Sequence, residues 1–242
     1  MKTLFSFFFS LLLSVSTRDI AAQGSVPGYH DPALSRNKLL REQQGEGVYK
    51  LIGAYKVKGI SYLFGQKLVA DIFSVKETAA NVNINYDTYN QEIEFFSTES
   101  PAKPLVKIPG DIDSFVVKPQ ADAGINEELH FIYGPLAGSS EKAYFQVITS
   151  GKRFSLYKRY KSELGYVSDN YIQSELRQFD MLSDYFYYDA VTKKMKKIKL
   201  NLSNVTKEFK SVKDVSGIAT NDDFTSDPEG AMRKIFAVLN EG

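Results

Sequence analysis

Short runs of alternating apolar and polar residues occupy the first two thirds of the chain. In Asn81–Tyr86, apolar side chains take every second position, and an asparagine takes each position between them. A period of two is that of a strand with one buried face, here the face that carries Val82 and Ile84. Asp87–Asn90 supplies turn residues, and Glu92–Phe95 then alternates in the same way, so the pattern predicts a β-hairpin.

Similar strand-like runs continue along the chain as far as residue 200. They lie at residues 67–73, 105–108, 112–117, 128–133, 143–149, 153–160, 184–189 and 195–200. Pro109-Gly110 and Ser150-Gly151 fall between neighbouring runs and predict tight turns. The last two runs predict a further hairpin. The polar and irregular segment 164–181 is interpreted as a long loop over the sheet.

After residue 200 the hydrophobic period changes from two to 3.6, which is the period of an amphipathic helix. A first helix is predicted from the spacing of Leu202, Val205 and Phe209, with Asn201 or Ser203 as its cap. A second helix begins at Asp227-Pro228, because aspartate caps a helix well and proline suits its first position. Its apolar stripe is Met232, Ile235, Phe236 and Leu239.

The N-terminal segment has the pattern of a secretory signal peptide. Lys2 provides the positive start, an uncharged apolar run follows, and Ala21-Ala22 provides small residues for cleavage after Ala22. The apolar run has about 12 residues, whereas a membrane-spanning helix needs about 20, so no transmembrane helix is expected after cleavage. Residues 23–46 form a polar leader, within which Asp31–Gln44 could hold a short helix.

Strands first and helices last predict a sheet-rich α+β fold. We expect two small antiparallel sheet or open-barrel units with C-terminal helices. The expected divisions are 1–22 (signal peptide), 23–46 (polar leader), 47–120 (β-rich unit) and 127–242 (β-hairpins followed by helices). Fifteen tyrosines and 17 phenylalanines without any tryptophan fit this picture, because aromatic side chains suit half-buried pleated surfaces.

The order of these features forms a layout that covers most of the chain. It comprises the aromatic-rich signal segment, the strand at 81–87, its partner at 92–95, the hairpin at 144–160, the aromatic and lysine runs at 185–199, and the closing helix. In this layout the chain resembles a family of exported proteins of Bacteroidota whose function is uncharacterised. This resemblance implies a place in the bacterial envelope or outside the cell, and it implies no active site.

Composition restricts the chemistry that is open to this chain. It contains no cysteine, which excludes thiol catalysis, disulfides and thiolate metal sites. Its histidines are His30 in the leader and His130 in a strand, and no nucleophile motif accompanies either. A strand histidine at a sheet edge or interface is the preferred interpretation of His130. The formal charge is +1, which gives no global basis for nucleic-acid binding.

Acidic residues offer the remaining candidates for catalysis or metal binding. Glu92 and Glu94 share one strand face, as do Asp111 and Asp113, and paired carboxylates could serve a glycosidase. The alternation favours solvated faces opposite Ile93 and Ile112. The acidic residues at 222–229 lack the spacing of a calcium loop and are better explained as caps and turn residues. No catalytic residue, metal site or cofactor is therefore assigned.

The densest charge run is the lysine cluster at 193–199, which follows Tyr185, Tyr187 and Tyr188. A solvated edge strand is the preferred interpretation, because lysines protect an exposed edge from pairing with other chains. Lys196 falls on the same side as the apolar residues of this run. The alternative is a contact surface for an anionic glycan or lipopolysaccharide. The candidate binding surface is formed by Tyr185, Tyr187, Lys197 and Lys199.

These patterns favour an exported, non-enzymatic binding or accessory module of the cell envelope. Its expected location is periplasmic, outer-membrane-associated or extracellular, with an envelope protein or an anionic glycan surface as partner. The alternative is a carboxylate-based hydrolase that acts on glycans outside the cytoplasm, since such an enzyme needs neither cysteine nor many histidines.

Overall fold

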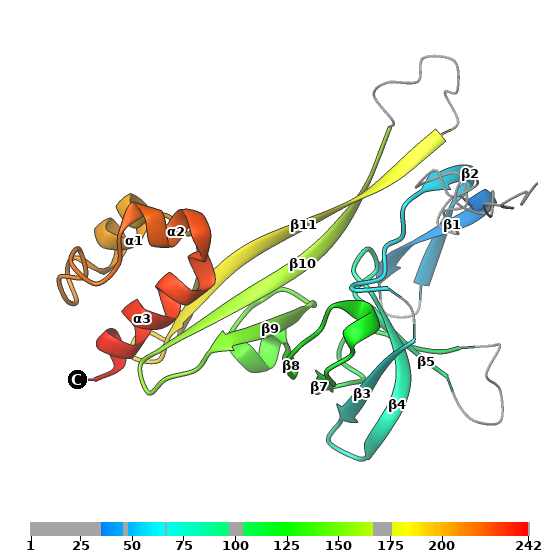
Figure 1. The fold of residues 1–242 in the computed structure, drawn as a ribbon. Helices are drawn as coiled ribbons and strands as arrows, with labels where there is room; N and C mark the ends of the chain where they lie inside the picture. Colours follow the sequence, from blue (N-terminus) through cyan, green and yellow to red (C-terminus); the bar gives the residue numbers. More distant parts are fainter. Residues whose placement is uncertain (1–34, 46–47, 66, 97–103, 167–175, 242) are drawn as a thin grey trace, which may run out of the picture.

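The computed structural model shows one large open sheet with helices at one end (Figure 1). It describes residues 35–45, 48–65, 67–96, 104–166 and 176–241, and for 35–45 and 48–56 it describes the backbone alone. The segment predicted to be a signal peptide, His30 and the start of the leader lie outside the described residues. No helix in the described part of the chain is long and apolar enough to cross a membrane.

Twelve strands in the described residues form this sheet. They are β1 (Ser35–Gly45), β2 (Val48–Lys58), β3 (Leu68–Phe73), β4 (Thr78–Asp87), β5 (Glu92–Phe96), β6 (Leu105–Lys107), β7 (Ser114–Val117), β8 (Leu129–Tyr133), β9 (Tyr144–Thr149), β10 (Phe154–Tyr166), β11 (Leu176–Asp189) and β12 (Lys194–Ile198). Their order is β1-β2-β11-β10-β9-β8-β7-β3-β4-β5-β6, and β12 also pairs with β11. Short 3₁₀ turns η2 (Ala121–Ala123) and η3 (Gly134–Ala137) flank β8. The division into two small units is not confirmed, because the strands of both predicted units belong to one sheet.

The hairpin of β10 and β11 connects the two ends of the molecule. Its antiparallel register runs without a bulge from Phe154↔Asp189 to Tyr166↔Arg177. In Figure 1 it crosses the structure, with the helices at one end and β3–β8 beside its middle. The loop predicted at 164–181 is therefore wrong at its two ends, because the hairpin extends to Tyr166 and resumes at Leu176. Pairing between the two strands satisfies the backbone of this polar stretch, which carries little hydrophobic signal of its own.

The helix predicted in the leader is also wrong. Ser35–Gly45 forms β1, which pairs antiparallel with β2. β2 in turn pairs in parallel with β11 at Leu176–Gln178. β1 is a strand because its backbone hydrogen-bonds to β2, the next strand along the chain, and the capping signal near Asp31 carries no information about that pairing.

The C-terminal helices are built from the residues that predicted them. α1 (Leu202–Phe209) has Asn201 as its N-cap, and α3 (Pro228–Asn240) has Asp227. A short helix, α2 (Asn221–Ser226), lies between them and has a capping box in which Thr220 and Asp223 exchange hydrogen bonds. Of the acidic residues at 222–229, Asp223 and Asp227 therefore act in helix caps.

The helices cover one face of β9–β12 and enclose what we call the helix-covered cluster. It comprises Ile148, Phe154, Leu156, Tyr187, Ile198, Val205, Phe209, Val215, Ala219, Phe224, Ala231, Met232, Ile235, Phe236 and Leu239. Phe154 lies at its centre, with ring contacts to Phe209 and Phe236. Asn240, at the end of α3, accepts hydrogen bonds from the backbone N–H groups of Arg153 and Phe154 at 2.9 and 2.8 Å. The last helix is thereby fastened to the β9–β10 hairpin.

A second cluster, the aromatic cluster, lies on the same face of the sheet further along β9 and β10. Its centre is formed by Tyr86, Phe115, Phe131 and Tyr144, which are at most 1% exposed. Phe115 and Phe131 stack at 4.6 Å, and Tyr86 meets Tyr144 edge-on at 5.8 Å. Such ring pairs add about 1 kcal/mol each beyond the area they bury.

Candidate functional site

A cavity of about 460 Å³ lies where the two clusters meet, and we call it the junction cleft. Three parts of the chain surround it: the turn before β3, the segment between η2 and β8, and the face shared by β9, β10 and α3. The lining residues are Phe64, Gly124, Ile125, Asn126, Glu127, Leu129, Gln146, Tyr160 and Glu229. Its volume is within the usual range for small-molecule sites.

Strand alternation places polar groups beside this cleft on an otherwise apolar face. On β10, Lys158 lies between Leu156 of the helix-covered cluster and Tyr160 of the aromatic cluster. On β9, Gln146 is the direct cross-strand partner of Lys158. Both polar residues therefore point to the buried face at the position where one cluster ends and the other begins.

The start of α3 brings a carboxylate to the same place. Asp227 caps the helix by accepting a hydrogen bond from the backbone N–H of Gly230, which leaves Glu229 in the first turn. The Glu229 Oε1 atom accepts hydrogen bonds from Lys158 Nζ at 2.9 Å and from the Tyr185 hydroxyl at 2.6 Å. A carboxylate in the first turn is also favoured by the helix dipole.

The two donors to Glu229 both hold their protons at neutral pH. Burial alone would lower the pKa of the Lys158 ammonium, but the hydrogen bond to Glu229 outweighs burial and raises that pKa above its usual value. Burial and the hydrogen bond to Glu229 together raise the pKa of the Tyr185 phenol to about 12. Lys158 therefore stays charged and Tyr185 keeps its proton, so Glu229 has two donors fixed on it.

The other wall combines an aromatic ring with neutral hydrogen-bonding groups. The Tyr160 hydroxyl donates to Gln146 Oε1 at 2.9 Å, which orients the amide. The Phe64 ring meets the Tyr160 ring edge-on at 5.8 Å and is 36% exposed. Phe64 has a φ of 57°, a left-handed conformation that is uncommon for a bulky residue and costs on the order of 1 kcal/mol. The structure therefore holds an exposed ring at the cleft in a strained conformation.

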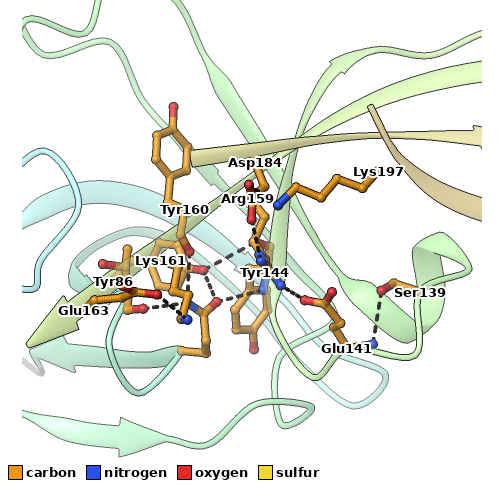
Figure 2. Close-up of polar contacts among 12 residues, drawn as sticks. Tyr86, Ser139, Glu141, Tyr144, Arg159, Tyr160, Lys161, Glu163, Asp184 and Lys197 are labelled. Carbon is orange, nitrogen blue, oxygen red and sulfur yellow. Dashed lines mark hydrogen bonds and ion pairs between the residues drawn. The ribbon is translucent and has the colours of Figure 1, made fainter. Parts of the chain in front are cut away.

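A separate polar network lies on the opposite face of the sheet (Figure 2). Arg159 forms ion pairs with Asp184, at 2.7 Å, and with Glu141. Lys197 also approaches Asp184, at 2.6 Å. Burial would raise the pKa of Asp184, but the two cations outweigh burial and hold it below its usual value. The network links β10, β11 and β12 and does not reach the junction cleft, because Arg159 and Lys158 are consecutive and point to opposite faces.

The four residues of the predicted binding surface do not share one face. Tyr185 and Lys158 are cross-strand partners on the face that the helices cover, and Tyr187 is 4% exposed within the helix-covered cluster. Lys197 is the partner of Phe186, which places it on the opposite face, and Lys199 is exposed just after β12. Only Tyr185 contributes to the junction cleft, through its bond to Glu229. The prediction that Lys196 shares the side of Ile198 is confirmed, since their partners on β11 are Tyr187 and Tyr185.

The carboxylate pair on β5 is buried, contrary to the predicted solvated face. Glu92 is 0% exposed and Glu94 is 9% exposed. Glu94 accepts a hydrogen bond from the Asn85 side chain at 2.9 Å, and Asn85 also accepts one from the backbone of Lys67. The rule of alternation fails here because successive residues are buried on both strands, over the last four residues of β4 and the first three residues of β5. No group of three or more His, Asp or Glu side chains in the described residues could hold a metal ion.

His130 does not lie at a sheet edge, because β8 runs between β7 and β9. Its side chain is exposed and lies 3.7 Å from Glu128. This correction follows from strand order, which depends on β7 and β9 and cannot be deduced from the residues of β8. His130 itself is not among the residues that line the junction cleft, although its neighbour Leu129 is.

The residues that build the cleft were missed at the level of sequence, although a signal for two of them was present. Lys158 takes a position of the apolar alternation between Leu156 and Tyr160. Gln146 takes the equivalent position between Tyr144 and Ile148 on the preceding strand. A polar residue on an apolar strand face indicates a buried pair or a site. Phe64 and Glu229 carried no comparable signal.

Comparison of the chain with protein-family models, with curated proteins and with solved structures found no match. Its function is therefore inferred from the geometry of the junction cleft.

Proposed function

We propose that this chain is an exported, non-enzymatic binding module that holds a small polar ligand in the junction cleft. The observation that carries the proposal is the cleft itself: a cavity of about 460 Å³ with an exposed aromatic ring and oriented polar groups. Sites of this kind combine apolar walls with a few fixed hydrogen-bonding groups that set orientation. The periplasm, the outer membrane or the cell exterior is the proposed location, on the basis of the signal-peptide pattern.

The chemistry of the lining favours a neutral, hydroxyl-rich ligand such as a sugar. The Phe64 ring offers an apolar surface for the C–H face of a sugar ring, and the Gln146 and Asn126 amides can both donate and accept hydrogen bonds. The Lys158 ammonium, which lies beside the cleft, is already paired with Glu229. An anionic ligand would therefore have to displace Glu229 from its two donors.

Binding without hydrolysis is supported by the electrostatics of the carboxylates. A glycosidase needs one carboxylic acid whose pKa is raised so that it can donate a proton at neutral pH. Five described carboxyl groups have pKa values that hydrogen bonds and ion pairs hold below the usual range, so none of these five is such an acid: Asp71, Asp184, Glu208, Asp214 and Asp223. Glu229 carries two fixed donors and is arranged as a structural anchor.

The test is calorimetric titration of the mature protein with neutral disaccharides (cellobiose, maltose and chitobiose) and with their monosaccharides. We expect at least one to bind, and Phe64→Gly to weaken that binding by about tenfold or more, because it removes the ring. Glycine accepts positive φ, so the same variant should keep or gain stability in thermal unfolding. Loss of binding without loss of stability separates a ligand contact from a structural role.

Phe73→Ala provides the matched control, because Phe73 is 37% exposed and does not line the cleft. Its affinity should equal that of the unaltered protein. Equal losses of affinity in Phe64→Gly and Phe73→Ala would contradict the proposal. The proposal would also be contradicted if none of the sugars bound to the unaltered protein. Appearance of new reducing ends during the titration would favour the hydrolase.

Export is tested separately by fractionating cells that produce the full chain. The intact mass of the exported form should correspond to removal of residues 1–22. Recovery of the uncleaved chain in the cytoplasmic fraction would contradict export and would leave the binding experiment unaffected.

A further inference from the structure

Positive charge is concentrated in one short segment of this nearly neutral chain. Residues 193–213 contain eight lysines and one acidic residue, Glu208, so their net charge is +7, whereas the whole chain carries +1. The rest of the chain is therefore acidic overall, with a net charge of −6. The segment comprises β12, α1 and the turns beside them.

The fold shapes part of this segment into a groove. A cavity of about 480 Å³ lies between β12 and α1, lined by Lys197, Ile198, Lys199, Asn204, Lys207 and Glu208. Ile198 is buried, so the exposed side chains of the groove are polar, and three of them are lysines. We call this cavity the lysine groove.

Internal ion pairs use some of these lysines and leave others available. Glu208 accepts a hydrogen bond from the Tyr187 hydroxyl and pairs with Lys196 at 3.3 Å. The hydrogen bond from Tyr187, together with the ammonium of Lys196, outweighs burial and holds the pKa of Glu208 below its usual value. Lys197 is paired with Asp184. In the described part of the chain, Lys199 and Lys207 have no ion-pair partner, and both are exposed.

We propose that the lysine groove binds a polyanionic carbohydrate chain, one that bears carboxylate or sulfate groups. Spaced ammonium groups in a concave surface suit a linear polyanion, which releases counterions when it binds. A bilayer surface fits less well, because no exposed large apolar side chain lines the groove to insert among lipids. A nucleic acid fits less well, because the groove offers no aromatic ring for base stacking.

The test uses heparin and polygalacturonate as carbohydrate probes, with anionic phospholipid vesicles and single-stranded DNA as the competing classes. Affinity is measured at several salt concentrations for the unaltered protein and for the double variant Lys199→Gln/Lys207→Gln. We expect a carbohydrate polyanion to bind most tightly. The double variant should lower the slope of log affinity against log salt by about two, one for each lysine removed.

Lys76→Gln/Lys107→Gln is the matched control, because both lysines are exposed and lie outside the groove, Lys76 in the turn between β3 and β4 and Lys107 on β6. It changes the net charge by the same amount and should leave the slope nearly unchanged. An equal fall in both double variants would show attraction by net charge alone and would overturn the proposal. Tighter binding to the vesicles or to the DNA, or no binding at all, would also overturn it.

Discussion

The helix-covered cluster and the aromatic cluster lie on the same face of one sheet and are assembled in different ways. The first is closed by three helices from the last 41 residues of the chain, whose apolar stripes lie on top of β9–β12. The second is made mostly by strand residues, from Leu68 on β3 to Tyr160 on β10, with Leu63, Ile112 and Ile125 added from the segments between strands. β9 and β10 contribute to both. The junction cleft lies between the helices that cover the first cluster and the strands that form the second.

The cleft therefore depends on both clusters. Lys158 and Gln146 are fixed between apolar neighbours that belong to different clusters. Movement of one cluster relative to the other would separate Glu229, carried by α3, from Tyr160 and Phe64 on the other side. A preformed site of this kind binds with little cost of ordering.

The largest effect is expected from Phe154→Ala in the helix-covered cluster. Phe154 is 1% exposed and contacts the rings of Tyr187, Phe209 and Phe236. Truncation should lower the free energy of unfolding by about 4 kcal/mol. Phe115→Ala in the aromatic cluster should cost a similar amount. Because β9 and β10 serve both clusters, urea unfolding followed by circular dichroism and by tyrosine fluorescence should give one shared transition. Two separate transitions would show that the clusters fold independently.

Lys158→Met tests the connection between the clusters. The substitution removes the cation that pairs with the Glu229 carboxylate. Both side chains are partly buried, since that of Lys158 is 18% exposed and that of Glu229 is 27% exposed. The expected loss is about 3 kcal/mol in the free energy of unfolding. Adding Glu229→Gln to this variant should restore part of the loss. A loss below about 0.5 kcal/mol, typical of a surface position, would mean that the pair does not hold the junction.

Asn240→Ala tests how firmly α3 is fastened to the strands that both clusters share. The Asn240 side chain accepts from two backbone N–H groups and donates to the carbonyl oxygens of Phe154 and Phe236, at 3.0 and 2.8 Å. Leaving these groups unsatisfied should cost about 2 kcal/mol. Hydrogen exchange should accelerate at Arg153 and Phe154 in this variant. Unchanged exchange at these two amides would contradict the fastening role.

Asp184→Asn gives the smallest expected effect and a specific pH dependence. The pKa of Asp184 is lower in the folded protein than the value of about 3.9 in an unfolded chain, so its ion pairs stabilise the fold above about pH 4. That contribution disappears as pH falls through the folded pKa. The variant should therefore be less stable than the unaltered protein by about 1 kcal/mol at pH 7, and the difference should shrink below pH 4. A difference that is constant with pH would contradict this assignment.

Elements whose partners are local in sequence could be predicted. The hairpin of β4 and β5, the β9–β10 turn region, α1 and α3 are confirmed, because their hydrophobic periods and caps lie within a few residues. α2 was not predicted as a helix, since six residues give too little periodicity.

Strand pairing explains where the hydrophobic pattern failed, even between consecutive segments of the chain. β1 is mostly polar and becomes a strand because β2 pairs with it, and β11 extends past the predicted loop because β10 supplies its partner. The burial of Glu92 and Glu94 likewise depends on what covers the second face of their strand. The cleft combines residues as far apart in the sequence as Phe64 and Glu229, so its composition depends on the order of the strands. The local pattern carried a signal only for the polar positions Gln146 and Lys158.

The most direct test of the central claim is a titration of the isotope-labelled mature protein with the disaccharides, followed by backbone and side-chain amide NMR shifts. Perturbations should concentrate at Phe64, Asn126 and Gln146, and the amides of the lysine groove and of Phe73 should remain unmoved. Such a pattern would place a neutral ligand in the cleft between two unmoved clusters. Perturbations centred elsewhere, or no perturbation with any of the sugars, would contradict the account.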